Sequence, residues 1–350
     1  VKEYADDDYR VAGVGALFCT VSFTSKSASG NTATDMVTDL KFEDCDVELM
    51  TVDATGGTVD GQVRDEVGVG LLAGVTANND DRVSGVYRKV TMDGCKVAGA
   101  ENVGGLLGSS GYCSRSTATN STSEMVTKSI TPKTASPVKL YDCSYANMDV
   151  IGGRNVGGYV GKVGQTSSCG IWETGENLAS VASNSNVKAT DAGKPSICVG
   201  GIFGWTQCSI SVNTELGTNR VATTGVAKIS NVTVESPMQY SIYDRNNLPG
   251  AGGFIGRADY GKNSIYNLTI TAAEEGCYIG GSAANSGNLN NIGGCIGYII
   301  SGNGSSYRFD GCTFSGLHIA AKGSGTGGLI GNFTSNYDIT CNAITAEGLK

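Results

Sequence analysis

Apolar and polar residues alternate along most of the chain in stretches of about five residues, separated by Gly, Asn, Asp and Ser. Strict alternation is typical of a β-strand with one buried face, whereas an amphipathic helix needs a longer run with a period of 3.6. Almost no run of the second kind occurs. The pattern therefore predicts an all-β protein made of many short strands.

A glycine-rich hexapeptide divides the chain into repeated units. Its six copies are VGGLLG at 103–108, VGGYVG at 156–161, VGGIFG at 199–204, AGGFIG at 251–256, IGGCIG at 292–297 and TGGLIG at 326–331. Two degenerate copies, GALFC at 15–19 and VGLLA at 69–73, come before them, and the mean spacing is about 45 residues. This recurrence indicates a repeat protein.

The paired glycines of the motif contribute to the high glycine content, 52 of the 350 residues. A chain that turns a corner needs positive φ or close backbone approach, and glycine supplies both without steric cost. We assign this turning role to Gly104, Gly105, Gly157, Gly158, Gly200, Gly201, Gly252, Gly253, Gly293, Gly294, Gly327 and Gly328.

A second element, upstream of most glycine motifs, reads as a short strand after a tight turn of Asp, Asn or Gly. Aligned copies share one column that holds Cys45, Cys95, Cys143, Val232, Leu268, Cys312 and Cys341. Interchange of cysteine with valine and leucine indicates a buried apolar position. We expect reduced thiols there, because side chains on stacked strands about 5 Å apart run parallel, a poor direction for a disulfide.

A unit with only a few short strands cannot bury its own apolar face, so copies must stack and share one core. The sequence thus predicts a parallel β-solenoid of about eight coils with inserted loops. No composition break divides the chain, so we expect one domain over residues 1–350. It has an N-terminal arm at 1–10, irregular first coils at 11–74 and regular coils at 75–350.

The V-G-G-Φ-Φ-G element resembles the GLUG repeat of bacterial surface and secreted proteins, and the resemblance spans residues 11–350. It implies a right-handed parallel β-helix in which the repeat is a scaffold without catalytic residues. The sequence departs from the GLUG pattern at Ala16, Cys19, Val69 and Ala73, within the two irregular first coils.

Net charge and hydropathy restrict the partners. The formal charge of −8, with no cluster of Lys or Arg, would repel a phosphate backbone, so we expect no nucleic-acid partner. The longest apolar stretches, such as CIGYII at 295–300, are far shorter than the ~20 residues of a membrane helix. We therefore expect no membrane span.

The first ten residues have no signal-peptide pattern, so the chain is either cytosolic or has lost a leader.

Cysteine usage favours an oxidising compartment, because twelve cysteines occur without a C-x-x-C pair. Outside the column, and besides Cys19, the disulfide candidates are Cys113, Cys169, Cys198, Cys208, Cys277 and Cys295. Cys169 with Cys198, or Cys198 with Cys208, are the partners suggested by loop positions. The sequence does not determine the connectivity.

Catalytic and metal chemistry find little support. His318 is the only histidine, and GVGLLAG at 68–74 lacks the helix and acidic partner of a dinucleotide site. The acidic clusters at 6–8 and 78–82 have no calcium-loop spacing, so we expect neither metal nor cofactor. The carboxylates Asp44, Asp46, Asp142 and Asp310 mostly occupy turn positions, where Asp bonds its own backbone.

The most economical hypothesis is an extracellular or cell-surface structural protein, not an enzyme, that self-associates or binds another surface protein through its solenoid ends. The first alternative is an adhesin or glycan-binding module, with Tyr112, Trp172 and Trp205 as sugar-stacking candidates in or near loops 109–136 and 162–195. The second is a polysaccharide-active β-helix enzyme. Glycosylation sequons occur at Asn120, Asn231, Asn267, Asn303 and Asn332, and Asn120 and Asn303 fall in predicted loops.

Overall fold

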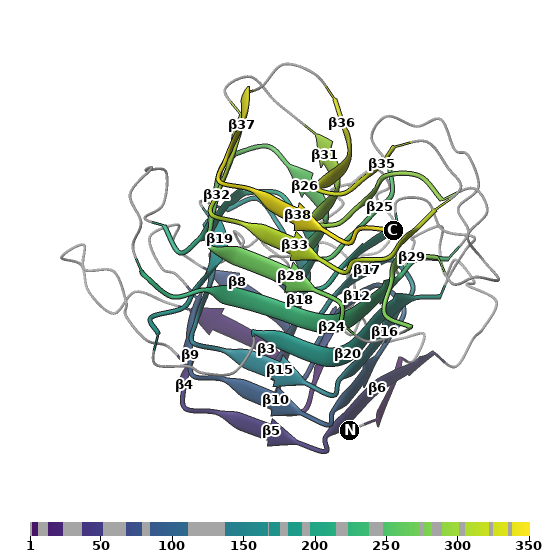
Figure 1. The fold of residues 1–350 in the computed structure, drawn as a ribbon. Coiled ribbons are helices and arrows are strands. Elements are labelled where there is room, and N and C mark those ends of the chain that lie inside the picture. Colours follow the sequence, from purple (N-terminus) through teal and green to yellow (C-terminus); the bar gives the residue numbers. More distant parts are fainter. Residues whose placement is uncertain are drawn as a thin grey trace, which may run out of the picture.

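The computed structural model is all-β: the described part of the chain contains strands and no helix (Figure 1). It covers residues 2–5, 13–23, 37–51, 68–78, 85–110, 137–166, 168–175, 181–190, 197–214, 223–237, 248–273, 276–281, 289–300, 305–321, 325–334 and 338–350. No helix long and apolar enough to span a bilayer occurs within these ranges. The prediction of an all-β protein is confirmed.

The strands form four parallel sheets, which we call A to D. Sheet B contains β2 (Gly13–Gly15), β7 (Gly68–Gly70), β12 (Asn102–Gly104), β17 (Asn155–Gly157), β21 (Cys198–Gly200), β25 (Gly250–Gly252), β30 (Ile292–Gly293) and β35 (Thr326–Gly327). Sheet C contains β3 (Phe18–Phe23), β8 (Ala73–Asn78), β13 (Leu107–Ser110), β18 (Val160–Val163), β22 (Phe203–Thr206), β26 (Ile255–Asp259), β31 (Ile296–Ile300) and β36 (Ile330–Phe333).

Sheet D contains β4 (Val37–Thr38), β9 (Gly85–Arg88), β14 (Val138–Tyr141), β19 (Ser168–Trp172), β23 (Ser209–Val212), β27 (Lys262–Tyr266), β32 (Ser306–Asp310) and β37 (Asp338–Asn342). Sheet A contains β1 (Lys2–Ala5), β5 (Lys41–Glu43), β6 (Asp46–Thr51), β10 (Thr91–Asp93), β11 (Lys96–Ala98), β15 (Ser144–Ala146), β16 (Asp149–Gly152), β20 (Ala182–Ala189), β24 (Ala227–Glu235), β28 (Leu268–Thr271), β29 (Ile279–Gly280), β33 (Thr313–Ser315), β34 (Ile319–Ala320) and β38 (Thr345–Glu347).

The chain visits these sheets in a fixed order: B, C, D, A and then B again. Each passage adds strands that pair in parallel with those of the passage before it, so that the sheets rise together from β5 to β38 (Figure 1). This stacking of parallel sheets is consistent with the predicted β-solenoid.

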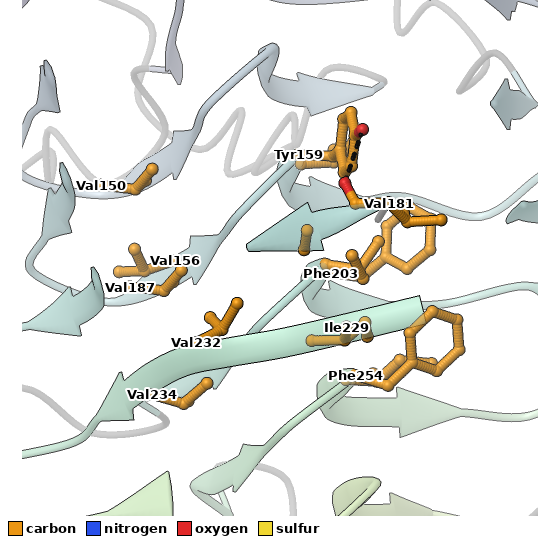
Figure 2. Close-up of a cluster of buried hydrophobic side chains, with 14 of the residues drawn as sticks. Val150, Val156, Tyr159, Val181, Val187, Phe203, Ile229, Val232, Val234 and Phe254 are labelled. Carbon is orange, nitrogen blue, oxygen red and sulfur yellow. Dashed lines mark hydrogen bonds between the residues drawn. The ribbon is translucent and has the colours of Figure 1, made fainter. Parts of the chain in front are cut away.

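Apolar side chains from the sheets meet in one continuous core. Figure 2 shows Val156 of sheet B beside Val187 of sheet A, and Ile229 of sheet A beside Phe254, which lies at the turn from sheet B to sheet C. Phe203 and Phe254 make an edge-to-face contact with ring centroids 5.9 Å apart. In the same cluster the Tyr159 hydroxyl donates a hydrogen bond to the carbonyl oxygen of Val181, at 3.1 Å.

The glycine motif lies at the turn from sheet B to sheet C, where backbones touch. A Cβ at Gly157 would overlap the carbonyl oxygen of Val160 and lie 2.7 Å from the Gly204 nitrogen of the following copy. None of the twelve motif glycines has positive φ. Of the two reasons predicted for these glycines, close backbone approach is the one that applies, at every position except Gly328.

Positive φ occurs instead at the corners, mostly in Asn, Asp and Gly. Within sheet A these residues stack from strand to strand: Asp44 (φ 49°), Gly94 (63°), Asn147 (53°), Asn184 (46°) and Asn231 (53°). Asn and Asp tolerate this conformation better than other residues with a side chain. The turn residues of the second sequence element thus shape the corners.

A glycine-to-alanine pair tests the close approach. We expect Gly158→Ala to lower the free energy of unfolding by about 1 to 3 kcal/mol, because its Cβ would overlap the Gly201 carbonyl oxygen and the Tyr145 hydroxyl. The control is Gly328→Ala, the same motif position in the last copy, where the added Cβ meets only the flexible Leu349 side chain. Denaturant unfolding measures both, and equal losses would contradict the packing argument.

Candidate interaction surfaces and buried polar sites

Four of the cysteines in the predicted column lie at strand corners and make the same local hydrogen bond. The thiols of Cys45, Cys95, Cys143 and Cys312 each donate to the carbonyl oxygen two residues earlier, at 3.2 to 3.6 Å. In each case the residue between has positive φ. The Ser185 hydroxyl makes the equivalent bond at 2.6 Å. A thiol or hydroxyl after an Asx or Gly corner therefore caps that corner.

The strand register divides the predicted column among three positions. Cys45 and Cys95 directly precede the paired residues Asp46 and Lys96, in the corner inside sheet A that also contains Val232. Cys143, Leu268 and Cys312 lie in the corner between sheets D and A. Cys341 is paired with Phe309 in sheet D and is exposed, because β37 is the last strand of that sheet.

No disulfide is present among the described cysteines, which are all free thiols. Cys198 and Cys295 are buried, and Cys277 is half-buried beside His318 in the lining of a small cavity. Burial raises the pKa of the Cys198 thiol to about 12, although Arg257 lowers it, so this thiol is poorly reactive. Cys113 lies outside the described residues, as do both preferred sequons, Asn120 and Asn303.

Two of the aromatic residues considered for sugar stacking, Trp172 and Trp205, make contacts within the fold. Trp205 lies between two cations of neighbouring strands, Lys162 at 4.4 Å and Arg257 at 4.7 Å from its ring centroid. Its indole N–H donates to Asp259, which also forms a buried ion pair with Arg257 at 2.7 Å. Charged groups are rarely buried unless they are paired in this way.

Lys162, Arg257 and Asp259 were missed by the sequence analysis, although the repeat contains the signal. Lys162, Trp205, Arg257 and Tyr298 each follow the final glycine of a motif copy, and the register pairs them across β18, β22, β26 and β31. The repeat period therefore places these four residues in one row. Their pairing could have been predicted from the alignment of the motifs.

Trp172 is also buried, and its ring stacks on Tyr141 with centroids 5.0 Å apart. Its indole N–H donates to the carbonyl oxygen of Thr214 at 2.7 Å. Arg88 lies over the other aromatic ring of this pair, 4.7 Å from the Tyr141 centroid. Trp172 is thus held within the fold, and Tyr112 lies outside the described residues.

The carboxylates considered for catalysis do not converge. Asp44 lies at a sheet A corner, Asp46 is exposed on β6, and Asp310 accepts a hydrogen bond from Asn342 at 2.9 Å. Asp142 is bonded not to its own backbone, as predicted, but to the amide and hydroxyl of Thr174 at 2.7 and 2.8 Å. The part of the chain that the structure describes contains no cluster of three or more metal-ligating side chains.

Glu173 lies beside Asp142 and was not found from the sequence. It is 2 % exposed and its Oε1 has no hydrogen-bond partner. Burial, and secondly the charge of Asp142, raise the pKa of the Glu173 carboxyl to about 8. Glu173 can therefore hold a proton near neutral pH, which is a property of its surroundings and leaves no local sequence signal.

The rows of core side chains run to both ends of the stack, and there they become exposed. In sheet C, one register row runs from Phe18 to Ile330; its six inner members, Ala73, Leu107, Val160, Phe203, Ile255 and Ile296, are fully buried. Phe18 is 50 % exposed and Ile330 is half-buried. Phe333, at the end of a second row, is 53 % exposed.

A scan against protein-family models, a search of curated proteins and a search of solved structures each gave no match.

The raised pKa of Glu173 predicts how stability depends on pH. Between pH 4.5 and about 8 the unfolded chain has released this proton while the folded chain keeps it, so stability falls as pH rises through this window and levels off above it. The loss is at most about 1.4 kcal/mol per pH unit. The glutamine of the Glu173→Gln variant cannot ionise. The stability of this variant relative to the wild type should therefore increase as pH rises.

Thermal melts from pH 4 to 9 measure this difference. The control is Asp338→Asn, which removes an exposed carboxylate on β37 and should keep the wild-type profile. Parallel profiles for Glu173→Gln and the wild type would show that folding does not raise the pKa of Glu173.

Proposed function

We propose that this chain is an extracellular structural protein: a right-handed parallel β-helix of about eight coils that self-assembles at a cell surface or in a filament. The extracellular setting is supported by the resemblance to GLUG-repeat surface proteins and by cysteines without C-x-x-C pairs. The right-handed winding also follows from that resemblance. The coil number is supported by the eight strands in each of sheets B, C and D.

The observation that carries this proposal is the exposure of the core rows at both ends of the stack. Phe18 and Leu17 at the first strands and Phe333 at the last are half-exposed, and Leu349 near the last strand is about one-third exposed. Exposed apolar side chains gathered in this way are typical of interaction surfaces. A second solenoid end placed on them would continue the same core.

Main-chain edges coincide with these apolar ends. Among the described strands, β1 to β5 at one end and β34 to β38 at the other are paired on one side only. Unpaired strand edges are templates for further pairing. Because all strands are parallel, the last strands of one copy would pair with the first strands of the next. Such a head-to-tail contact does not close on itself and produces filaments.

Charge substitutions at the two ends test the proposal. We expect Phe18→Lys and Phe333→Lys each to reduce self-association at least tenfold in concentration, because a lysine there would have to be desolvated between copies. The control is Val226→Lys, which replaces a similarly exposed apolar residue, 43 % exposed, that lies just before β24 in the middle of the stack.

Sedimentation over a concentration series and electron microscopy of the native protein provide the measurement. Filaments in the wild type and the control, but short rods in both end variants, would support end-to-end assembly. A wild type that stays monomeric at high concentration would refute it.

A further inference from the structure

Two of the predicted disulfide cysteines, Cys169 and Cys208, meet in the core near the corner between sheets C and D. Cys169 is the second residue of β19, and Cys208 directly precedes β23. Both are buried members of the continuous hydrophobic core. The Cys208 thiol is close enough to the Cys169 thiol to raise its pKa, after the larger effect of burial. The chain between them makes one passage around the stack, so this contact joins successive layers.

The local geometry suits a bridge, because the two cysteines are not in register. Cys169 is paired with Ile210, two residues beyond Cys208. Four residues, 164–167, separate β18 from β19, whereas only 207 and 208 separate β22 from β23. The register therefore offsets the two cysteines diagonally across successive passages. In-register side chains run parallel, which does not fit the dihedral of about 90° across a disulfide.

The other cysteines that touch one another show the contrast. Cys45 and Cys95 are neighbours in register, and each thiol donates to the carbonyl oxygen of its own corner. The backbone N–H of Cys45 also donates to the Cys95 sulfur at 3.4 Å. The Cys45 and Cys95 thiols therefore cap their own corners, whereas the Cys169 thiol interacts with the thiol of Cys208.

We propose that Cys169 and Cys208 form a disulfide when the chain folds in the presence of a low-molecular-weight disulfide such as oxidised glutathione. One cysteine thiolate attacks the glutathione S–S bond and releases one glutathione as its thiol. The second thiolate then attacks the mixed disulfide and releases the second glutathione. Two protein thiols are oxidised to one protein disulfide, and one glutathione disulfide is reduced to two thiols.

The timing of this reaction follows from burial. Burial, followed by the contact with Cys208, raises the pKa of the Cys169 thiol well above its usual range. The attacking species is the thiolate, so the folded chain reacts slowly and the bridge closes during folding. Both disulfide pairings suggested by the loop positions involve Cys198 instead. Cys198 lies in sheet B, where burial raises the pKa of its thiol and the charges of Arg257 and Lys162 lower it.

The test uses the wild-type chain, so it does not depend on the folding of a variant. The reduced, unfolded protein is refolded in a glutathione redox buffer, its free thiols are alkylated, and it is digested without reduction for mass spectrometry. We expect a cross-linked peptide that joins Cys169 to Cys208. Recovery of both residues in alkylated form, or a cross-link from either one to Cys198, would overturn the proposal.

Matched serine variants locate the bond. Cys208→Ser should remove the cross-linked peptide, whereas Cys198→Ser, which removes another buried thiol, should leave it intact. The refolded wild type should also melt several degrees higher before reduction than after it, and Cys208→Ser should show no such difference. A cross-link to Cys169 that persists in Cys208→Ser would assign the bond elsewhere.

Discussion

The rest of the fold depends on the contact between backbones at the turn from sheet B to sheet C. A side chain at Gly104 would overlap the carbonyl oxygen of Leu107 and lie 2.7 Å from the nitrogen of Gly161 in the next copy. Each motif thus needs glycine for its own turn and for the copy stacked on it. Close packing at this turn lets Val156 of β17 and Phe254, at the turn after β25, reach the same core (Figure 2). Because the contact recurs wherever another copy stacks on the turn, the motif recurs in the sequence.

The corners have two other requirements. They need a residue with positive φ and a hydrogen-bond donor for the carbonyl oxygen that precedes it. Asn, Asp or Gly supplies the conformation, and the following thiol or hydroxyl donates to the carbonyl, as at Asp142 and Cys143. Two corners of the fold use this same pair of residues. A sequence alignment therefore places Cys95 and Cys143 in one column, although the register separates them by a whole strand.

The ends and the interior of the stack differ only in what lies next to them. Ile296 and Ile330 occupy one register row, yet the first is fully buried and the second is half-buried, because only the first has a strand on both sides. The same repetition that builds the core therefore leaves an apolar surface wherever it stops. An assembly that continues the stack would use the interactions already present inside it.

The sequence by itself determined the strands, the repeat and the stacking, because alternation, glycine spacing and the Asx corners are local features that each copy repeats. It also indicated that Cys95, Cys143 and Cys312 are buried, since cysteine there interchanges with valine and leucine. Only the tertiary structure decided which corner each occupies and that Cys169 lies against Cys208. It alone showed that Asp259 accepts the indole hydrogen bond of Trp205 and that Glu173 lies beside Asp142. These contacts join residues on different passages of the chain, which no local pattern in the sequence brings together.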